Sequence, residues 1–213
     1  MELKAAIQAV YAAFSDAEKP ELVDGCPCCM TAEQYEILTL KPIRELTTAD
    51  LDEFARDALL TMGTEDDYLY FLPRILELSI EDGADWLTSI EITGDKMRMA
   101  GFDKWPGERR SAINDLWFTV IREMATSDDD PELLGYISSD MGSWLAAATP
   151  IPITVSPLTG VLDRFPELIR TLYNDNFKTL FQGRLDNAFL KESSDGQTQI
   201  ANWLRRRVES TMR

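Results

Sequence analysis

The 213-residue chain contains no histidine and only three cysteines. Without histidine it lacks the side chain that normally titrates near neutral pH, which excludes the Ser–His and Cys–His pairs of nucleophilic enzymes. Every metal site that needs an imidazole ligand is excluded as well. An odd number of cysteines in one short stretch is not the disulfide framework of a small secreted protein. The composition therefore favours a reducing, cytoplasmic environment.

Long apolar runs and excess positive charge are also missing. No stretch reaches the roughly 18 uninterrupted apolar residues of a membrane-spanning helix, and the N-terminus lacks the pattern of a signal peptide. The 37 acidic and 21 basic residues give a net charge of -16. This charge opposes direct binding to nucleic acid or to an anionic membrane, because both require cationic patches. We therefore expect a protein that binds neither.

Helical periodicity dominates the sequence that is present. Apolar residues recur at spacings of three and four, and about nine such segments can be recognised. The stretch 149–160, which has three prolines and several β-branched residues, is the exception and the best candidate for a hinge between subdomains. We predict a single all-α domain over residues 1–213. Its helices would form antiparallel pairs, arranged as an irregular, HEAT-like α-α superhelix or as a multi-helix bundle.

Local signals predict where several helices begin and end. Thr31 is expected to open a short helix over 31–40. Thr47 or Thr48 is expected to cap a helix that continues to about Met62, where Gly63 ends it.

The later helices are predicted from their apolar positions. Residues 65–80 form a buried helix that Pro73 either kinks or divides, because proline removes a backbone hydrogen bond. Residues 84–93 begin as a helix and turn at Gly94, and 108–124 form a strong amphipathic helix. One further helix is expected before the 149–160 stretch, over 128–148. Three more are expected after it, over 161–173, 175–191 and 197–211.

Several short motifs occur together: CPCC at 26–29, PIRELT at 42–47, FLPRILEL at 71–78, WPGER at 105–109, AF at 188–189 and NWL at 202–204. In this order they resemble an uncharacterised family of bacterial helical proteins, and FLPRILEL is the most specific of them. The resemblance implies an all-helical, bacterial, cytoplasmic protein. It implies no activity, cofactor or catalytic residue.

The cysteine cluster is the feature most suited to chemistry. Cys26, Cys28 and Cys29 could hold zinc, although a structural zinc site normally has four ligands and the chain has only three sulfurs. A Cys26–Cys28 disulfide, or thiols of lowered pKa near a helix that begins at Thr31, would instead give a redox role. In a third interpretation the three residues are small buried hydrophobes that shape a loop.

Negative charge is concentrated in residues 44–96, which carry 14 acids and 4 bases and a net charge of -10, whereas 164–213 carry 6 acids and 9 bases and a net charge of +3. An acidic surface of this kind either aids solubility or steers a basic partner. The proposed interaction residues are Glu65, Asp66, Asp67, Glu81, Asp82 and Asp85.

Other charged residues are interpreted as structural. Arg74 and Glu77, three residues apart on one predicted helix, are expected to form an internal ion pair or a cap that holds neighbouring helices together. The same role is expected for Glu108 and Arg109 at the start of the long helix. The runs of acidic residues match no calcium-binding loop. A third hypothesis, acid–base catalysis by carboxylates alone, requires a pocket that holds a carboxyl group of raised pKa.

Taken together, these features predict a non-enzymatic, helical protein-interaction module. Its partner would be a protein, such as a basic toxin, a nucleic-acid-binding protein or a second copy of the chain. No cofactor is expected under this interpretation. The alternative is a thiol- or zinc-dependent protein centred on the cysteine cluster.

Overall fold

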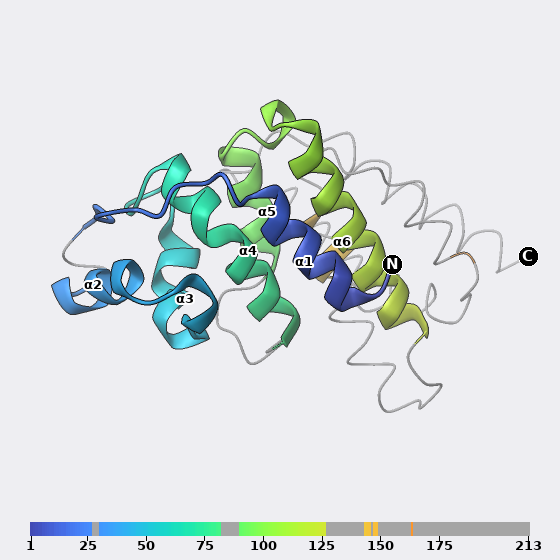
Figure 1. The fold of residues 1–213 in the computed structure, drawn as a ribbon, viewed down its shortest axis with the longest axis horizontal. Helices are drawn as coiled ribbons and strands as arrows, with labels where there is room; N and C mark the ends of the chain where they lie inside the picture. The colour runs from blue at the N-terminus through green and yellow to red at the C-terminus, as the bar shows by residue number, and fades with distance from the viewer. Residues whose placement is uncertain (27–29, 82–89, 127–142, 146, 149–162, 164–213) are drawn as a thin grey trace, which may run out of the picture. The chain divides into compact units, whose positions relative to one another are not determined.

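A computed structural model describes residues 1–26, 30–81, 90–126, 143–145, 147–148 and 163 (Figure 1). These residues are all-helical, as predicted, and contain no strand beyond isolated bridges. The elements in chain order are α1 (Leu3–Ala13), α2 (Ala32–Leu40), the 3-10 helix η1 (Ile43–Glu45), α3 (Thr48–Asp57), α4 (Glu65–Glu81), α5 (Ile90–Met99), the 3-10 helix η3 (Phe102–Lys104) and α6 (Gly107–Thr126).

The chain divides into two compact units. One comprises Glu2–Ile113, and the other comprises Met1 together with Asn114–Arg213. The division falls inside α6. The hinge predicted at 149–160 and the helices predicted after it lie outside the described residues.

In the unit Glu2–Ile113, α4 is the central element, because it packs against α1, η1, α3 and α5 (Figure 1). Helix α2 packs against α3, and α5 continues into η3. The fully buried side chains of this unit with the largest volumes are Tyr68, Phe54, Phe71, Phe102, Leu38, Leu46, Leu51, Leu72, Ile75, Leu76 and Met97. The core of this unit is therefore built around α4.

Helix α4 continues through Pro73, so of the two predicted outcomes, a kink or a division into two helices, the division is wrong. Proline inside a helix costs about 3 kcal/mol. Its neighbours Phe71, Leu72 and Ile75 are fully buried, and each such side chain contributes about 1.5–3 kcal/mol. The free energy gained by burying these side chains therefore exceeds the cost of the proline.

Helix α3 ends at Asp57, and its predicted continuation to Met62 is wrong. The residues after it form a turn in which Leu59 N–H donates to the Met62 carbonyl at 2.9 Å and Leu59 has a φ of 64°. Gly63 has the positive φ, 60°, that is typical of a glycine ending a helix. It nevertheless does not end α3, because it comes after this turn. Pairing within the turn and with residues 24–26 replaces the expected helical hydrogen bonds.

Helix α5 runs through Gly94, where the sequence predicted a turn. Glycine costs roughly 1 kcal/mol in a helix interior. The helix buries Ile90, Thr93 and Met97 on one side, and this burial outweighs the cost. By contrast, the predicted helices at 31–40 and 108–124 are confirmed within a few residues.

In the second unit, Trp117 of α6 packs against Trp144. Its ring lies 4.8 Å from that of Trp144, and its Nε1–H donates to the Trp144 carbonyl at 3.1 Å. Val120 and Ile121 are buried on the same helix. No helix in the described ranges has both the length and the apolar character needed to cross a membrane.

Candidate functional site

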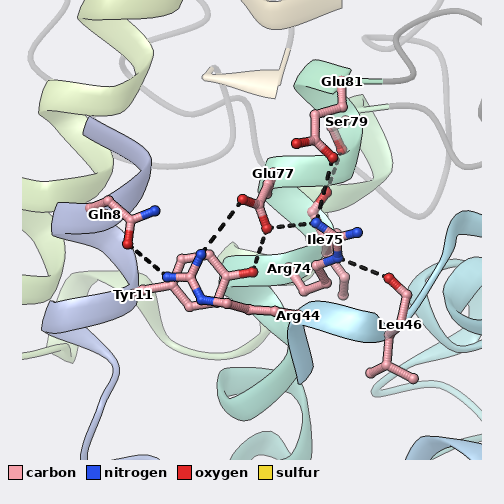
Figure 2. A network of polar contacts seen from close by, with 9 residues as sticks. All are labelled: Gln8, Tyr11, Arg44, Leu46, Arg74, Ile75, Glu77, Ser79 and Glu81. Carbon is pink, nitrogen blue, oxygen red and sulfur yellow. Dashed lines mark hydrogen bonds and ion pairs between the residues drawn. The ribbon is translucent and has the colours of Figure 1, made fainter. Parts of the chain in front are cut away.

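A network of charged side chains joins three elements of the unit Glu2–Ile113 (Figure 2). Glu77 on α4 accepts a hydrogen bond of 2.6 Å from the hydroxyl of Tyr11 on α1. The same oxygen, Oε2, accepts a second hydrogen bond of 2.6 Å from Arg74 Nη1. Arg74 Nε–H also donates to the Leu46 carbonyl at 2.8 Å. The network therefore fixes α1 and the segment after η1 against α4.

Arg44 of η1 completes this network from its exposed side. Its guanidinium lies 3.7 Å from the centre of the Tyr11 ring, within the range of a cation–π contact. It donates to Gln8 Oε1 at 2.8 Å and lies 3.8 Å from Glu77 Oε1 (Figure 2). Glu81 adds a longer contact of 3.5 Å to Arg74. Each ion of the network thus has an oppositely charged neighbour.

The electrostatics of the network are those of a structural cluster. Burial and the hydrogen bond to Glu77 raise the pKa of Tyr11, so its hydroxyl stays protonated and continues to donate. Burial alone would lower the pKa of Arg74, but its hydrogen bond and ion pair with Glu77 raise it. Glu77 is only 9% exposed, and its ion pair with Arg74 is largely buried. The cluster is therefore suited to holding helices together rather than to reacting.

A groove of about 730 Å³ lies in the same unit, between the segment that follows α1 and the N-terminal end of α4. Its volume is typical of a binding pocket. It is lined by Asp16, Ala17, Glu18, Lys19, Pro20, Glu21, Leu22, Thr64, Asp66, Asp67, Leu69 and Arg109.

The groove is negatively charged. Five carboxylates face two cations, Lys19 and Arg109, which leaves a net charge of -3. Among the residues that the structure describes, Glu18, Glu21 and Asp66 are exposed and have no hydrogen-bond or ion-pair partner. The groove therefore presents negative charge that the described part of the chain does not neutralise.

The cation Arg109, at the start of α6, is already neutralised. Its Nη2 lies 2.7 Å from Asp16 Oδ1, its Nε–H donates to the Ala13 carbonyl at 3.3 Å, and its guanidinium lies 4.8 Å from the Phe14 ring centre. The hydrogen bond from Arg109 holds the pKa of Asp16 below its usual value. Arg109 thus anchors the end of α1 at one wall of the groove, and Glu108 lies beside it in the first turn of α6.

The structure separates the predicted interaction residues. Glu65 and Asp66 are exposed in the first turn of α4, whereas Asp67 is 9% exposed and caps the helix by accepting from Thr64 N–H at 2.7 Å. Glu81 lies at the other end of α4, about 24 Å away at 1.5 Å per residue. Asp82 and Asp85 lie outside the described residues. Of the predicted residues, Asp66 and Asp67 line the groove, whereas Glu65 and Glu81 do not.

The cysteine cluster is described at one of its three positions. Cys26 is disulfide-bonded and half-buried, whereas Cys28 and Cys29 lie outside the described residues. No group of three or more Cys, Asp or Glu residues suited to a metal ion occurs within the described ranges.

Sequence reasoning missed two features of this unit. The acids Asp16, Glu18 and Glu21 were not among the predicted interaction residues, although three acids within six positions were the available signal. Lys96 on α5 is 3% exposed, and its Nζ donates to the Ala58 carbonyl at the end of α3. Burial lowers its pKa to about 8. A single lysine within a helical segment carries no signal in the sequence that its side chain is buried.

Comparison of the chain with protein families, with curated proteins and with solved structures finds no match.

Proposed function

We propose that this chain is a non-enzymatic, helical protein-interaction module that binds a basic segment of a protein partner in the acidic groove. The observation that carries the proposal is a set of carboxylates, Glu18, Glu21 and Asp66, that have no partner within the described ranges and line a groove of about 730 Å³. Their charge would speed and orient the approach of a basic partner.

The chemistry of the groove favours arginine- or lysine-rich polypeptide as its occupant. Its carboxylates would pair with guanidinium or ammonium groups, and arginine can bind a carboxylate through two parallel hydrogen bonds. Its apolar lining, Ala17, Pro20, Leu22 and Leu69, would contact the methylene stems of these long side chains. The same charge would repel nucleic acid and anionic lipid.

We extend the proposal to the setting of the protein. A helical scaffold of about nine helices in antiparallel pairs, as a superhelix or a bundle, would present the groove from a rigid frame. The three clustered cysteines, an odd number, are not the disulfide framework of a small secreted protein, and this favours a cytoplasmic protein. The resemblance of FLPRILEL and the accompanying motifs favours a bacterial one.

The proposal is tested with a fluorescent hexa-arginine peptide, whose binding is followed by anisotropy at low and at physiological salt. The triple variant Glu18→Gln/Glu21→Gln/Asp66→Asn removes the unpartnered carboxylates. We expect its affinity to fall roughly tenfold, because three exposed ion pairs are each worth about 0.2–1 kcal/mol. The salt dependence of binding should also become weaker.

A matched control removes the same charge elsewhere. The triple variant Glu33→Gln/Glu36→Gln/Glu45→Gln changes three exposed acids on α2 and η1, which do not line the groove. Its affinity should change less than about twofold, since distant exposed charges are screened. Equal losses in the two variants would assign binding to net charge and would discard the groove.

A further inference from the structure

The groove begins where a short backbone ladder ends. Gly63 N–H donates to the Asp24 carbonyl at 2.7 Å, and Cys26 N–H donates to the Thr61 carbonyl at 3.0 Å. The two segments are antiparallel at the bridge between these bonds. The ladder therefore pairs residues 24–26 with residues that directly precede α4.

Leu22 is the position at which this ladder would continue. Alternate residues of a strand direct their N–H and C=O groups to the same side, so Leu22 belongs to one set with Asp24 and Cys26. In the antiparallel register its partner would be Glu65, because Asp24 lies opposite Gly63. Glu65 instead begins α4, after Gly63 has turned the chain with a φ of 60°. From Leu22 back toward α1, the neighbouring strand is therefore missing.

Residues 18–22 run past the start of α4 with open backbone groups (Figure 1). They form no helix, and Pro20 favours an extended chain at itself and at Lys19. Since proline lacks an N–H, these five residues carry four N–H and five C=O groups, and none of them bonds to another residue that the structure describes. Pro20 is half-buried and the other four residues are exposed. One wall of the groove is therefore a row of accessible backbone donors and acceptors.

This wall is held in place at both ends. Before it, Phe14 is 3% exposed, and Arg109 lies 2.7 Å from Asp16 in an ion pair. After it, Val23 is 2% exposed, whereas its two neighbours in the sequence are exposed, which is the alternation of a strand with one buried side. A wall that is already fixed loses little conformational freedom when a ligand pairs with it.

The charge of the groove decides which chain can pair with this wall. An unpaired strand edge is a template for another strand, and proline and charged side chains commonly protect it. Here the protecting residues are Glu18, Lys19, Pro20 and Glu21. A second copy of this chain would bring the same excess of negative charge and would be repelled. The arginine and lysine side chains of a basic segment would instead pair with the carboxylates.

We propose that the basic segment binds as an added strand, which lies extended in the groove and exchanges backbone hydrogen bonds with residues 18–22. It takes the place that the chain leaves where α4 begins, and the backbone of Leu22 is the first group with which it pairs. This mode of recognition rests on the function proposed above. Backbone pairing adds affinity that does not depend on charge. The partner segment must therefore be extended, with free N–H groups, and a basic helix does not fit.

The first test compares two hexa-arginine peptides of equal charge. One has ordinary amides, and the other is N-methylated at its four central residues. Methylation of consecutive residues removes donors in every register, which is necessary because a peptide of one residue type can shift along the wall. We expect the affinity, measured by fluorescence anisotropy, to fall about tenfold, or 1.4 kcal/mol, on methylation. The salt dependence of binding should be the same for both peptides, because their charge is the same.

Amide hydrogen exchange of the protein locates the pairing. The Leu22 N–H should exchange at least tenfold more slowly when the unmethylated peptide saturates the groove. The Glu21 N–H is the matched reference, because it is equally exposed but belongs to the other set of alternate residues. Its exchange should slow less than about threefold.

The outcomes separate this proposal from the function on which it rests. Weaker binding of the methylated peptide together with slower exchange at Leu22 supports the added strand. Equal affinity of the two peptides, or unchanged exchange at Leu22 in the saturated complex, overturns the added strand. In that case the groove keeps its proposed function as long as Glu18→Gln/Glu21→Gln/Asp66→Asn weakens binding. Failure of either peptide to bind at all overturns both.

Discussion

The two ends of α4 use their carboxylates in different ways. Glu77, in the C-terminal half, is 9% exposed and accepts hydrogen bonds of 2.6 Å from both Tyr11 and Arg74. Asp66, in the first turn, is exposed at the groove and has no partner in the part of the chain that the structure describes. One helix therefore carries a carboxylate committed to the fold and another that is available to a ligand.

The contrast shows that burial and partners, rather than residue type, divide these acids between stability and binding. Removing one member of a buried ion pair leaves an uncompensated charge in a poorly hydrated place, which is costly. Removing an exposed acid without a partner changes little inside the protein. Local charge density in the sequence does not make this distinction, because Glu77 lies between long apolar residues and Asp66 lies in an acidic run.

The largest effect is expected from Glu77→Gln. The variant leaves Arg74 without its main counter-ion and replaces the acceptor of Tyr11, so the free energy of unfolding should fall by about 3–5 kcal/mol. Urea denaturation followed by tryptophan fluorescence measures this change. Asp66→Asn, the matched control at the other end of α4, should shift the free energy of unfolding by less than about 0.5 kcal/mol. Similar losses in the two variants would erase the distinction between the two ends.

Lys96 provides a third case, a buried charge whose hydrogen bond is to a neutral carbonyl. Burial lowers its pKa from 10.5 to about 8, although Asp57 and Asp95 oppose the shift. Below pH 8 the lysine is protonated in the folded and the unfolded chain, and the folded state bears the full cost. Between pH 8 and 10.5 the unfolded chain binds more protons, so stability should rise with pH, by up to about 3 kcal/mol.

This rise is measured by chemical denaturation at several pH values between 7 and 10. Lys96→Met, which keeps a long apolar side chain and removes the charge, should show no such increase. The difference between the two proteins isolates Lys96, because the raised pKa values of Tyr11 and Tyr68 act in the opposite direction only when tyrosines in the unfolded chain ionise, near pH 10. Parallel pH curves for the two proteins would show that Lys96 is solvated in the folded state.

Capping residues made parts of this fold predictable. Thr47 and Asp50 form the reciprocal hydrogen bonds of a capping box, and Thr31 caps α2 in the same way with Gln34. These signals act over three residues and therefore appear in the sequence. The apolar spacing of α6 predicted its buried side equally well, since Ile113, Leu116 and Trp117 are fully buried.

Features that depend on distant residues were not predictable in the same way. Helix α3 ends early where the Ala58 carbonyl accepts from Lys96, 38 positions away, and where residues 61–63 pair with residues 24–26. The groove similarly combines the segment after α1 with the start of α4. The sequence predicted Asp66 as an interaction residue, but its companions Glu18 and Glu21 became apparent only through this tertiary pairing.

The smallest effect concerns the cap at the groove end of α4. Thr64 N–H and its hydroxyl donate to Asp67 Oδ2 at 2.7 and 2.9 Å, and its Oγ1 accepts from Asp67 N–H at 3.2 Å. Thr64→Ala should lower the free energy of unfolding by about 1 kcal/mol, as should Thr47→Ala at the start of α3. Only Thr64 lines the groove, so only its substitution should weaken binding of the hexa-arginine peptide, by about twofold or 0.4 kcal/mol. Matching stability losses with unchanged affinity in both variants would show that the first turn of α4 contributes charge to the groove but does not set its shape.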